Sequence, residues 1–246
     1  MSDELDALLR EVDKKKAELG LKPQMAPDAE DAYRERFLFD SIYQSNAIEG
    51  NKLTRDEVEG VLLNNQVIAG KSLSDHVAVL GYRDALRLGR RYVCDNTHIG
   101  EHEIKKLHYK MLIDQQDVSG EYRHYNLMIH GHRPTSYQKV PLKMQELAES
   151  KPSGRCHPIE DIAFFHLRLE KIHPFGDGNG RVGRLIINIM LEQQGYPAII
   201  ITLDDRAEYF AALNAYDGLD GNPSVMPMRI LLAKLVLRHL DALLAL

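Results

Sequence analysis

The sequence predicts a mainly α-helical fold, and three observations support this class. Apolar side chains recur at helical intervals in several segments, and in residues 159–172 these intervals are three, four and three residues. Thr54 followed by Glu57 forms the capping-box pattern that opens helices. β-prone residues are concentrated in one short stretch, residues 120–141. We therefore expect a helical bundle with a single small β element.

The N-terminal segment is expected to form a helix over residues 3–19. Four apolar residues share one face of this helix: Leu5, Leu8, Leu9 and Val12. The Pro-containing stretch 22–27 ends the helix and is the only linker-like piece of the sequence. We therefore expect an N-terminal helical extension with its linker over residues 1–27, followed by one domain over residues 28–246.

Periodicity and capping signals place the other helices. One of them is expected to begin at Ser74, with an apolar side formed by Val77, Leu80, Ala85 and Leu88. The remaining helices are expected in the following places: residues 28–43 with a stop near Gly50, the segment that begins at Thr54, and residues 101–113, 159–172, 181–194 and 229–246.

The exception to this helical pattern lies between Gly120 and Pro141. Short β-prone pieces surround His130 and His132, and Pro134 and Pro141 act as stops. A small β-hairpin fits this segment better than any helix.

Composition and charge narrow the class of protein. The 246-residue chain has 31 Lys and Arg against 36 Asp and Glu, and its net charge of −5 argues against nucleic acid as a partner. The two cysteines, Cys94 and Cys156, suit a reducing compartment. The N-terminus is charged from residue 3, unlike a signal peptide, and the most apolar stretch, residues 229–246, carries four charged residues. We expect a cytoplasmic protein that does not span a membrane.

The most informative segment surrounds a glycine-rich loop. A helix is expected to end at His173 because Pro174 follows it, and a new helix is expected over residues 181–194. A glycine-rich loop at a helix N-terminus exposes backbone N–H groups at the positive end of the helix dipole. The segment therefore predicts an anion-binding site.

Charged side chains around this loop indicate phosphate chemistry. Arg181 and Arg184 are three residues apart and so share one helix face, which suits more than one phosphate group. Asp177 is a hard oxygen ligand of the kind that holds Mg²⁺ on phosphates. His173 can accept a proton from a hydroxyl near neutral pH. Together these residues predict phosphoryl or nucleotidyl transfer.

Other patterns in the sequence fit less well. Residues 178–183 match G-x-G-x-x-G and Asp204 follows, but a dinucleotide site needs a strand before the first glycine, whereas the preceding run has helical spacing. Residues 70–72, Gly-Lys-Ser, lack the first P-loop glycine, and a helix end followed by an N-cap serine explains them better. The histidines between positions 98 and 108 lack the H-E-x-x-H order, so we expect them to face solvent or to be satisfied structurally.

The segment from His173 to Arg184 matches H-P-F-x-D-G-N-G-R-x-x-R at every specified position, and it resembles the signature of the Fic family. Gly120–Arg123 with the following hairpin, and the run 195–210, resemble neighbouring segments of that family. The resemblance implies a Fic-type helical bundle with a small β-hairpin flap. It also implies that the protein transfers AMP from ATP to a Ser, Thr or Tyr hydroxyl of a target protein.

The resemblance further implies roles for the signature residues. His173 is the expected general base, Phe175 a buried anchor of the loop, and Asp177 the ligand of Mg²⁺. Arg181 is expected on the phosphates, and Arg184 is expected to seat the γ-phosphate. The full nucleotide-binding set comprises Glu49, Ile129, His130, Gly131, His132, Asp177, Gly178, Asn179, Gly180, Arg181, Val182, Gly183, Arg184, Tyr209 and Phe210.

Two of these groups lie outside the signature. Residues 129–132 resemble the flap, which covers the nucleotide and can bind a target segment by β-augmentation. Tyr209 and Phe210 resemble the residues that line the adenine and ribose. Asp217 stands where some family members carry Asn, so a contact of this residue with the nucleotide stays open.

A second motif lies in residues 45–51, which match [S/T]-x-x-x-E-[G/N] through Ser45, Glu49 and Gly50. Taken alone, these residues predict only the C-terminal end of a helix. Together with the signature, they resemble the N-terminal inhibitory helix found in one class of the family. That resemblance implies that Glu49 pairs with Arg184 and misdirects the phosphates of bound ATP.

Several alternatives stay open at this point. Some members of that class remove AMP from modified targets, so AMP removal is one alternative for this chain. A Fic enzyme that uses a different phosphate-containing donor is another. A non-catalytic regulator that binds a protein through its hairpin is a hypothesis of another kind. The expected partners are ATP, Mg²⁺, a target protein docking on the flap and a second copy of the chain in a homodimer.

Overall fold

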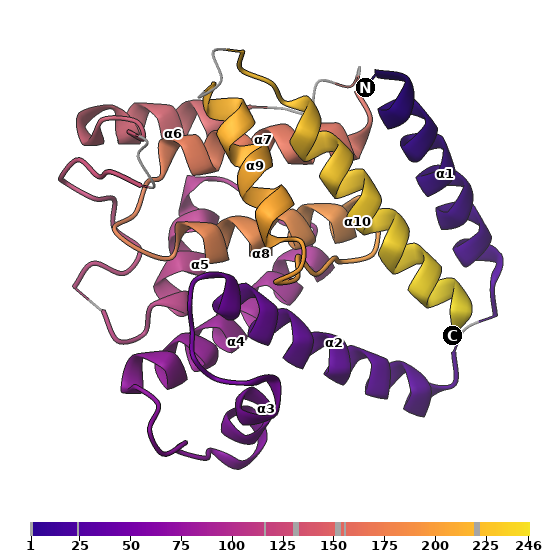
Figure 1. Ribbon diagram of the computed structural model, residues 1–246, viewed down its shortest axis with the longest axis horizontal. Helices are drawn as coiled ribbons and strands as arrows, with labels where there is room; N and C mark the ends of the chain where they lie inside the picture. Colours follow the sequence, from indigo (N-terminus) through magenta and orange to yellow (C-terminus); the bar gives the residue numbers. More distant parts are fainter. Residues whose placement is uncertain are drawn as a thin grey trace.

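The computed structural model describes residues 2–23, 25–115, 117–129, 133–150, 154, 156–218 and 222–246. These residues form ten α-helices and one short 3₁₀ helix, joined by loops (Figure 1). In chain order they are α1 (Ser2–Leu21), α2 (Pro27–Ile48), α3 (Arg55–Asn64), α4 (Leu73–Cys94), α5 (Glu101–Met111), η1 (Tyr137–Lys139), α6 (Val140–Ala148), α7 (Pro158–Ile172), α8 (Asn179–Gln193), α9 (Arg206–Asp217) and α10 (Met226–Ala245). The predicted mainly α-helical class is confirmed. No helix in these ranges combines the length and apolar character needed to cross a membrane.

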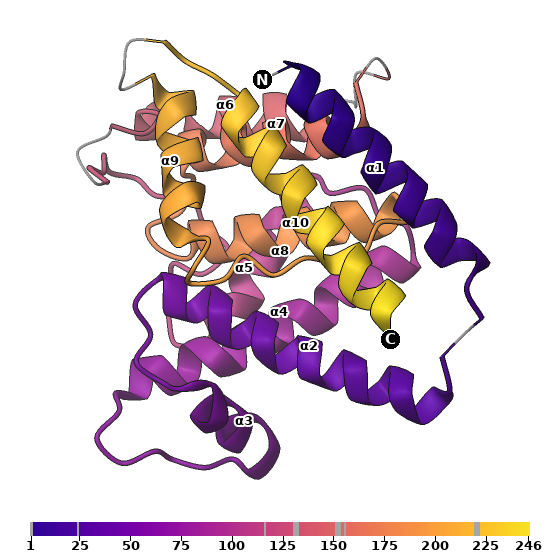
Figure 2. The ribbon, with the colours of Figure 1, turned by 45° about the vertical axis from the view of Figure 1, so that its right-hand side comes forward.

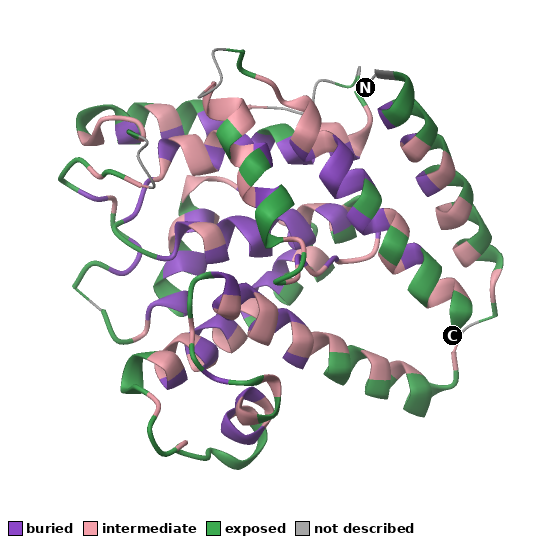
Figure 3. Cartoon of the chain, in the orientation of Figure 1, coloured by how far each residue is buried: buried purple, intermediate pink, exposed green. Residues whose placement is uncertain are grey.

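Helix α8 forms the centre of the bundle. It lies between α7 on one side and α4 on the other, and most of its residues are buried (Figures 1 and 3). Leu185 and Ile189 pack into a core shared with α4 and α5, whereas Ile187 and Leu191 pack into a second core shared with α7 and α10. Because both faces of α8 are buried, the loop that precedes it is anchored on a rigid element.

Helix α1 runs alongside α10, the last helix of the chain, as Figures 1 and 2 both show. Leu5, Leu9 and Val12 pack into the second core, as the apolar face expected for residues 3–19 requires. Lys22 Nζ donates hydrogen bonds to the carbonyl oxygens of Leu243 and Leu244 near the end of α10. The boundary predicted at residue 27 stays a prediction, although α1 shares a core with the rest of the bundle.

Helix α4 begins at Leu73, not at Ser74. Ser72 is its N-cap, and the Ser72 hydroxyl accepts a hydrogen bond from the backbone N–H of Asp75. The interpretation of Ser72 as an N-cap serine is therefore confirmed, whereas the helix end expected before it lies further back, because α3 ends at Asn64. The buried face of α4 includes Ala85 and Leu88, as predicted, and also Val79 and Tyr82. Val77 and Leu80, which we expected on this face, are only half-buried.

Two helices were not predicted from periodicity, α6 and α9. Pro141, which we expected to act as a stop, instead lies in the first turn of α6. The missing N–H of proline costs little there, because the first N–H groups of a helix have no intrahelical partner. A proline after an irregular segment therefore marked a helix start.

The predicted β-hairpin between residues 120 and 141 is not supported. The described residues of this segment contain no strand, and His130, Gly131 and His132 lie outside the described residues. The backbone of the described part bonds instead to the end of α7: the Arg123 N–H donates to the Pro174 carbonyl at 2.9 Å, and the Thr135 N–H donates to the Lys171 carbonyl at 3.1 Å. Groups that a hairpin would pair across two strands are used to attach the segment to α7.

Candidate active site

The signature loop is a short connection between α7 and α8. His173 is the C-cap of α7 and has a left-handed conformation with φ 48° and ψ 64°, and Gly178 precedes α8 with φ 76°. The side chain of Asn179 closes the loop, because its Oδ1 accepts from the Phe175 N–H and its Nδ2 donates to the Phe175 carbonyl, each at 2.9 Å. The amide of Asn179, predicted as part of the anion site, thus fixes the shape of the loop, since glycine alone would leave it free to move.

Phe175 is the anchor that the signature implies. It is buried, and its ring stacks on His108 of α5 at a centroid distance of 3.7 Å. His108 Nδ1 accepts a hydrogen bond from the Gly120 N–H at 2.8 Å, so its Nε2 carries the proton and donates to the Asp177 carbonyl at 2.9 Å. Burial lowers the pKa of His108 to about 4, so the ring is neutral. His108 is therefore a satisfied structural histidine, as expected for this group.

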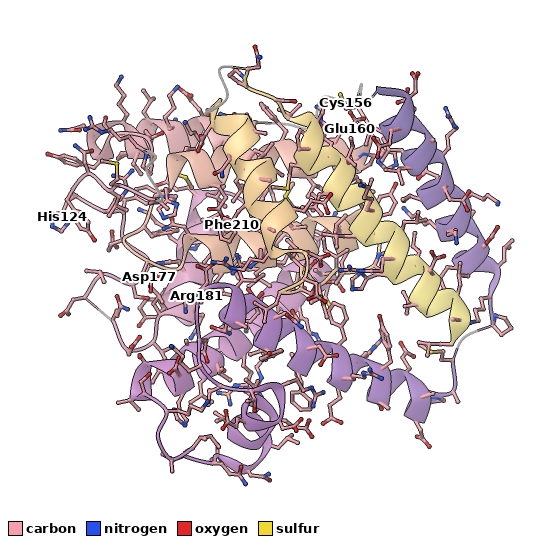
Figure 4. All side chains as sticks on the ribbon, in the orientation of Figure 1. His124, Cys156, Glu160, Asp177, Arg181 and Phe210 are labelled. Carbon is pink, nitrogen blue, oxygen red and sulfur yellow. The ribbon has the colours of Figure 1, made fainter. Side chains whose placement is uncertain are left out.

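Asp177 and Arg181 lie together at the N-terminal end of α8 (Figure 4). Arg181 Nη2 donates to Asp177 Oδ2 at 2.9 Å, and Asp177 Oδ1 accepts from the Gly178 N–H at 2.6 Å. The Asp177 side chain is 59% exposed, whereas that of Arg181 is 7% exposed. An accessible carboxylate beside free helix N–H groups fits Mg²⁺, which usually binds one or two carboxylates together with phosphate oxygens and water.

Arg184 is one turn further along α8 and is almost completely buried. It is held by the C-terminal end of α2: its Nε donates to the Ser45 hydroxyl at 3.0 Å, and its Nη2 donates to the Ser45 carbonyl and to Glu49 Oε1, both at 2.8 Å. Burial alone would lower the pKa of Arg184, but the carboxylate of Glu49 raises it above the ordinary value. The contact that the inhibitory motif implies is therefore present as a charge-assisted pair between a buried guanidinium and a carboxylate whose side chain is 40% exposed.

Glu49 also covers the start of α8. A Cβ atom at Gly180 would lie 2.4 Å from Glu49 Oε1 and 2.9 Å from an Arg184 guanidinium nitrogen. The carboxylate therefore rests directly on the glycine backbone at the end of the helix where anions bind. Only a glycine at position 180 allows this approach.

His173 is positioned by its own backbone. Its N–H donates to the Leu169 carbonyl, and its carbonyl accepts from Arg123 Nε at 2.7 Å. Its side chain is 18% exposed, and Nδ1 lies 3.8 Å from Glu170 Oε2. Burial, together with the positive charge of Arg123, lowers the pKa of His173 to about 4. The imidazole is therefore neutral at physiological pH and can accept a proton.

A cavity of about 280 Å³ opens beside these residues, between the end of α2, α7 and α9. Eight of the predicted site residues line it, and α9 adds an aromatic and apolar wall that includes Phe210 (Figure 4). The predicted residues on the cavity wall are Glu49, Gly50, Ile129, His173, Gly180, Arg184, Tyr209 and Phe210. A cavity of this size, with apolar walls and a few convergent charged groups, is the usual form of a small-molecule site.

Other predicted residues lie elsewhere. Asp177 and Arg181 line a neighbouring polar cavity of about 250 Å³, which shares Glu49 with the first. Val182 packs in the core, and Gly183 faces α7 and not the cavity. These two are parts of the helix packing that supports the site.

Three contributors to the site were not predicted. The guanidinium of Arg123 donates hydrogen bonds to four carbonyl oxygens, those of Tyr125, Thr135, Ile172 and His173. It therefore attaches the chain before and after residues 129–132 to the end of α7. Lys171 forms an ion pair with Asp217 at 2.5 Å on the cavity wall. Glu170 lies one helical turn before His173, and that spacing was the signal that could have identified it.

Comparisons with known proteins match this chain to one family. Residues 98–191 match the family described as Fic/DOC. The chain is 31% identical over 243 residues to "Protein adenylyltransferase Fic" of Nematostella vectensis, which covers 97% of this chain and 56% of that protein. It is 32% identical over 191 residues to the protein of the same name in Drosophila mojavensis, covering 76% of this chain and 38% of that protein. The chain thus spans about half or less of the length of these curated relatives.

Solved structures show the same fold. A Fic domain containing signalling protein from Bacteroides thetaiotaomicron superposes with a TM-score of 0.85 at 25% identity, covering 96% of this chain and 95% of that one. Fic-1 from C. elegans superposes with a TM-score of 0.88 at 27% identity, covering 99% of this chain and 73% of that one. Both similarities extend over nearly the whole of this chain.

Proposed function

The chain belongs to the Fic/DOC family, and from this premise we propose that it is a protein adenylyltransferase that transfers AMP from ATP to a Ser, Thr or Tyr hydroxyl of a target protein. One observation carries the proposal. His173, Asp177, Arg181 and Arg184 come from a single loop and the helix it precedes, and they surround the adjoining cavities. A proton acceptor, a carboxylate for Mg²⁺ and two guanidiniums are the groups that nucleotidyl transfer requires.

ATP would lie across the two cavities. Its base and ribose would contact the wall formed by α9, including Phe210, and its phosphates would lie at the N-terminal end of α8 near Arg181. Asp177 would hold Mg²⁺, which supplies positive charge to the phosphate groups. Arg184 would orient the γ-phosphate, and so fix the direction in which pyrophosphate leaves.

The chemical step uses the lone pair of His173. Its Nδ1 faces Glu170 on α7, so Nε2 is the nitrogen directed at the incoming hydroxyl. The target oxygen forms a bond to the α-phosphorus while its proton passes to Nε2, and the bond from the α-phosphorus to the bridging oxygen breaks as pyrophosphate leaves. The lowered pKa of His173 keeps the ring in its accepting form near neutral pH.

We further propose that the end of α2 inhibits this reaction. The Glu49 carboxylate binds one side of the Arg184 guanidinium and lies against the backbone of Gly180. The γ-phosphate of a productively bound ATP would lie at the same place. A carboxylate at that position both competes for Arg184 and repels phosphate. The same carboxylate, held beside His173 in one cavity, supports removal of AMP from a modified target as the alternative activity.

One experiment separates the candidate functions. The protein and its Glu49→Gly variant are incubated with Mg²⁺, a cell lysate and ATP labelled on the α-phosphate. Labelled protein bands are expected, and more of them with the variant. Bands that form only with another donor would assign a different substrate, loss of label from a previously modified target would assign AMP removal, and no transfer under any of these conditions would leave a non-catalytic regulator.

A further inference from the structure

Glu170 is a buried carboxyl group whose charge has no role in the mechanism above. It lies in the last turn of α7, and its side chain is only 11% exposed although it reaches the wall of the nucleotide cavity. Oε2 lies 3.8 Å from His173 Nδ1. Oε1 is fully buried and has no hydrogen-bond partner within the described ranges of the chain. Burial of a carboxyl group with an unsatisfied oxygen lowers the stability of the fold, which suggests that Glu170 is retained for a function.

The packing behind Glu170 holds the carboxyl in place. A Cβ atom at Gly183 would lie 2.6 Å from Glu170 Oε1 and 2.8 Å from His166 Cε1, so the carboxyl rests against the bare backbone of α8. His166 is fixed in turn, because its Nε2 is 2.9 Å from the Tyr209 hydroxyl. These contacts leave Oε2 directed toward the catalytic ring.

We propose that Glu170 is a positioning residue for His173: its carboxylate stabilises the imidazolium that forms when His173 accepts the proton of the target hydroxyl. The proposal rests on the adenylyl transfer proposed above. The proton stays on His173 Nε2, and Glu170 acts through its charge alone. At 3.8 Å in a cavity wall of low dielectric, a negative charge lowers the energy of an adjacent cation strongly.

The charged and titratable groups around Glu170 decide when it is ionised. Arg184 faces it from α8, Glu49 from the end of α2, His166 from its own helix, Tyr209 from α9, and Arg123 adds a positive charge beside His173. Burial raises the pKa of Glu170 to about 7, Arg184 acts in the opposite direction, and Glu49 adds to the increase.

The sign of the pH dependence follows from this. Below about pH 7 the carboxyl is protonated and carries no charge, and above it the carboxylate is present. His173, with its pKa lowered to about 4, is neutral on both sides of that value. A rise in the reactivity of His173 near pH 7 would therefore report the ionisation of Glu170, because the ring itself does not titrate there.

The test measures the reactivity of His173 without requiring transfer of AMP. Diethylpyrocarbonate acylates neutral imidazoles through a cationic intermediate, and peptide mass spectrometry gives its rate at each histidine. The ratio of the His173 rate in the parent to that in Glu170→Gln should be near one at about pH 6 and about tenfold at about pH 8. His124, which is exposed (Figure 4), is the internal control, and its ratio should stay near one at both values.

A ratio near one at both pH values would overturn the proposal, whether or not the protein transfers AMP. If Glu170→Gln does not fold, Glu170→Asp replaces it, because it keeps a carboxylate on a shorter side chain. In Glu170→Asp the acylation rate of His173 should increase less between about pH 6 and about pH 8 than it does in the parent. An increase as large as that of the parent would contradict a role that depends on the distance between the carboxylate and the ring.

Activity provides the second measurement. In a Glu49→Gly background, Glu170→Gln should lower kcat about tenfold at about pH 8, with little change at about pH 6 and an unchanged KM for ATP. A purely structural role would lower activity equally at both pH values. If the Glu49→Gly parent transfers no AMP while the acylation ratio still rises, the function proposed above fails and the pairing of Glu170 with His173 stands.

Discussion

Glu49 at the C-terminal end of α2 accepts a 2.8 Å hydrogen bond from Arg184 of α8, across 135 positions of sequence. The same guanidinium also donates to the side chain and the backbone of Ser45. The pair thus joins the end of one helix to the anion-binding start of another, and Gly180 provides the space for it. Binding of a phosphate group to Arg184 and retention of Glu49 at this position are therefore mutually exclusive in the function we propose.

Replacing His173 should stop the reaction and leave nucleotide binding intact. His173→Ala removes the proton acceptor, and loss of a general base costs about 10²–10⁴-fold in rate. His173 makes no contact with the groups expected to bind phosphate, so the affinity for ATP, measured by calorimetry in the Glu49→Gly background, should change little.

A matched variant gives the opposite pattern. Arg184→Ala in the same background should weaken ATP binding as well as transfer, because it removes a phosphate ligand. Full activity of His173→Ala would exclude the proposed chemical step.

Gly183→Ala should destabilise the protein. A Cβ atom there would lie 2.6 Å from Glu170 Oε1 and 3.0 Å from His166 Nδ1, and the His166 ring is buried and bonded to Tyr209. Crowding of this kind typically costs about 1–3 kcal/mol of the free energy of unfolding. The control is Gly20→Ala in α1, where a Cβ atom would meet nothing within 4 Å and the change should be neutral or slightly stabilising. Equal stability of the two variants in urea denaturation would show that the packing around Glu170 is looser than described.

The protein should lose stability as the pH falls below about 6.5, in part because of His108. Burial lowers the pKa of His108 in the folded protein to about 4, whereas its pKa in the unfolded chain is about 6.5. Between about pH 6.5 and about pH 4 the unfolded chain therefore binds a proton that the folded chain does not. The free energy of unfolding should therefore decrease by up to about 1.4 kcal/mol per pH unit for this residue alone. His166, whose pKa burial lowers to about 3, acts in the same direction.

The comparison variant is His108→Gln, which keeps a side-chain donor but cannot titrate. Urea denaturation at several pH values should show a shallower loss of stability in this variant than in the parent. The same pH dependence in both proteins would contradict the account of His108 as a buried neutral base.

The sequence predicted those parts of the structure that local patterns determine. The spacing of apolar residues located α7 to within one residue, and the N-cap interpretation of Ser72 agreed with the start of α4. The signature residues His173 and Arg184, and Glu49 from the distant motif, meet at one cavity as the family resemblance implied. In each case the signal was carried by residues close together in sequence or by a motif of many specified positions.

The errors arose where tertiary contacts decide the outcome. Arg123 donates hydrogen bonds to the carbonyl groups of Tyr125 and Thr135, two distant points within the segment that we expected to be a hairpin, and no local pattern reveals these contacts. Pro141 was read as a stop because a proline can end one element or begin the next, and the neighbouring chain decides which. Glu170 was overlooked because an acidic residue on a helix usually faces solvent, whereas here it packs against Gly183 of α8.

Glu49 controls access of the γ-phosphate to Arg184 in the function we propose. If it withholds Arg184 from the γ-phosphate, Glu49→Gly should transfer AMP on the order of 10²-fold faster than the parent. Arg184→Ala in the same background should remove this gain, so the effects of the two changes should be strongly non-additive. Glu49→Gln controls for changes in helix stability, because it removes the charge and keeps the helix propensity.

The most direct measurement is the rate at which Glu49→Gly and the parent incorporate AMP from ATP in the presence of Mg²⁺, followed by intact-protein mass spectrometry of the enzyme and of labelled targets. We expect rapid incorporation by the variant and slow incorporation by the parent. If the variant is no faster than the parent while both bind ATP equally well, residues 45–51 are only the end of a helix, and the pair of Glu49 with Arg184 does not control the reaction.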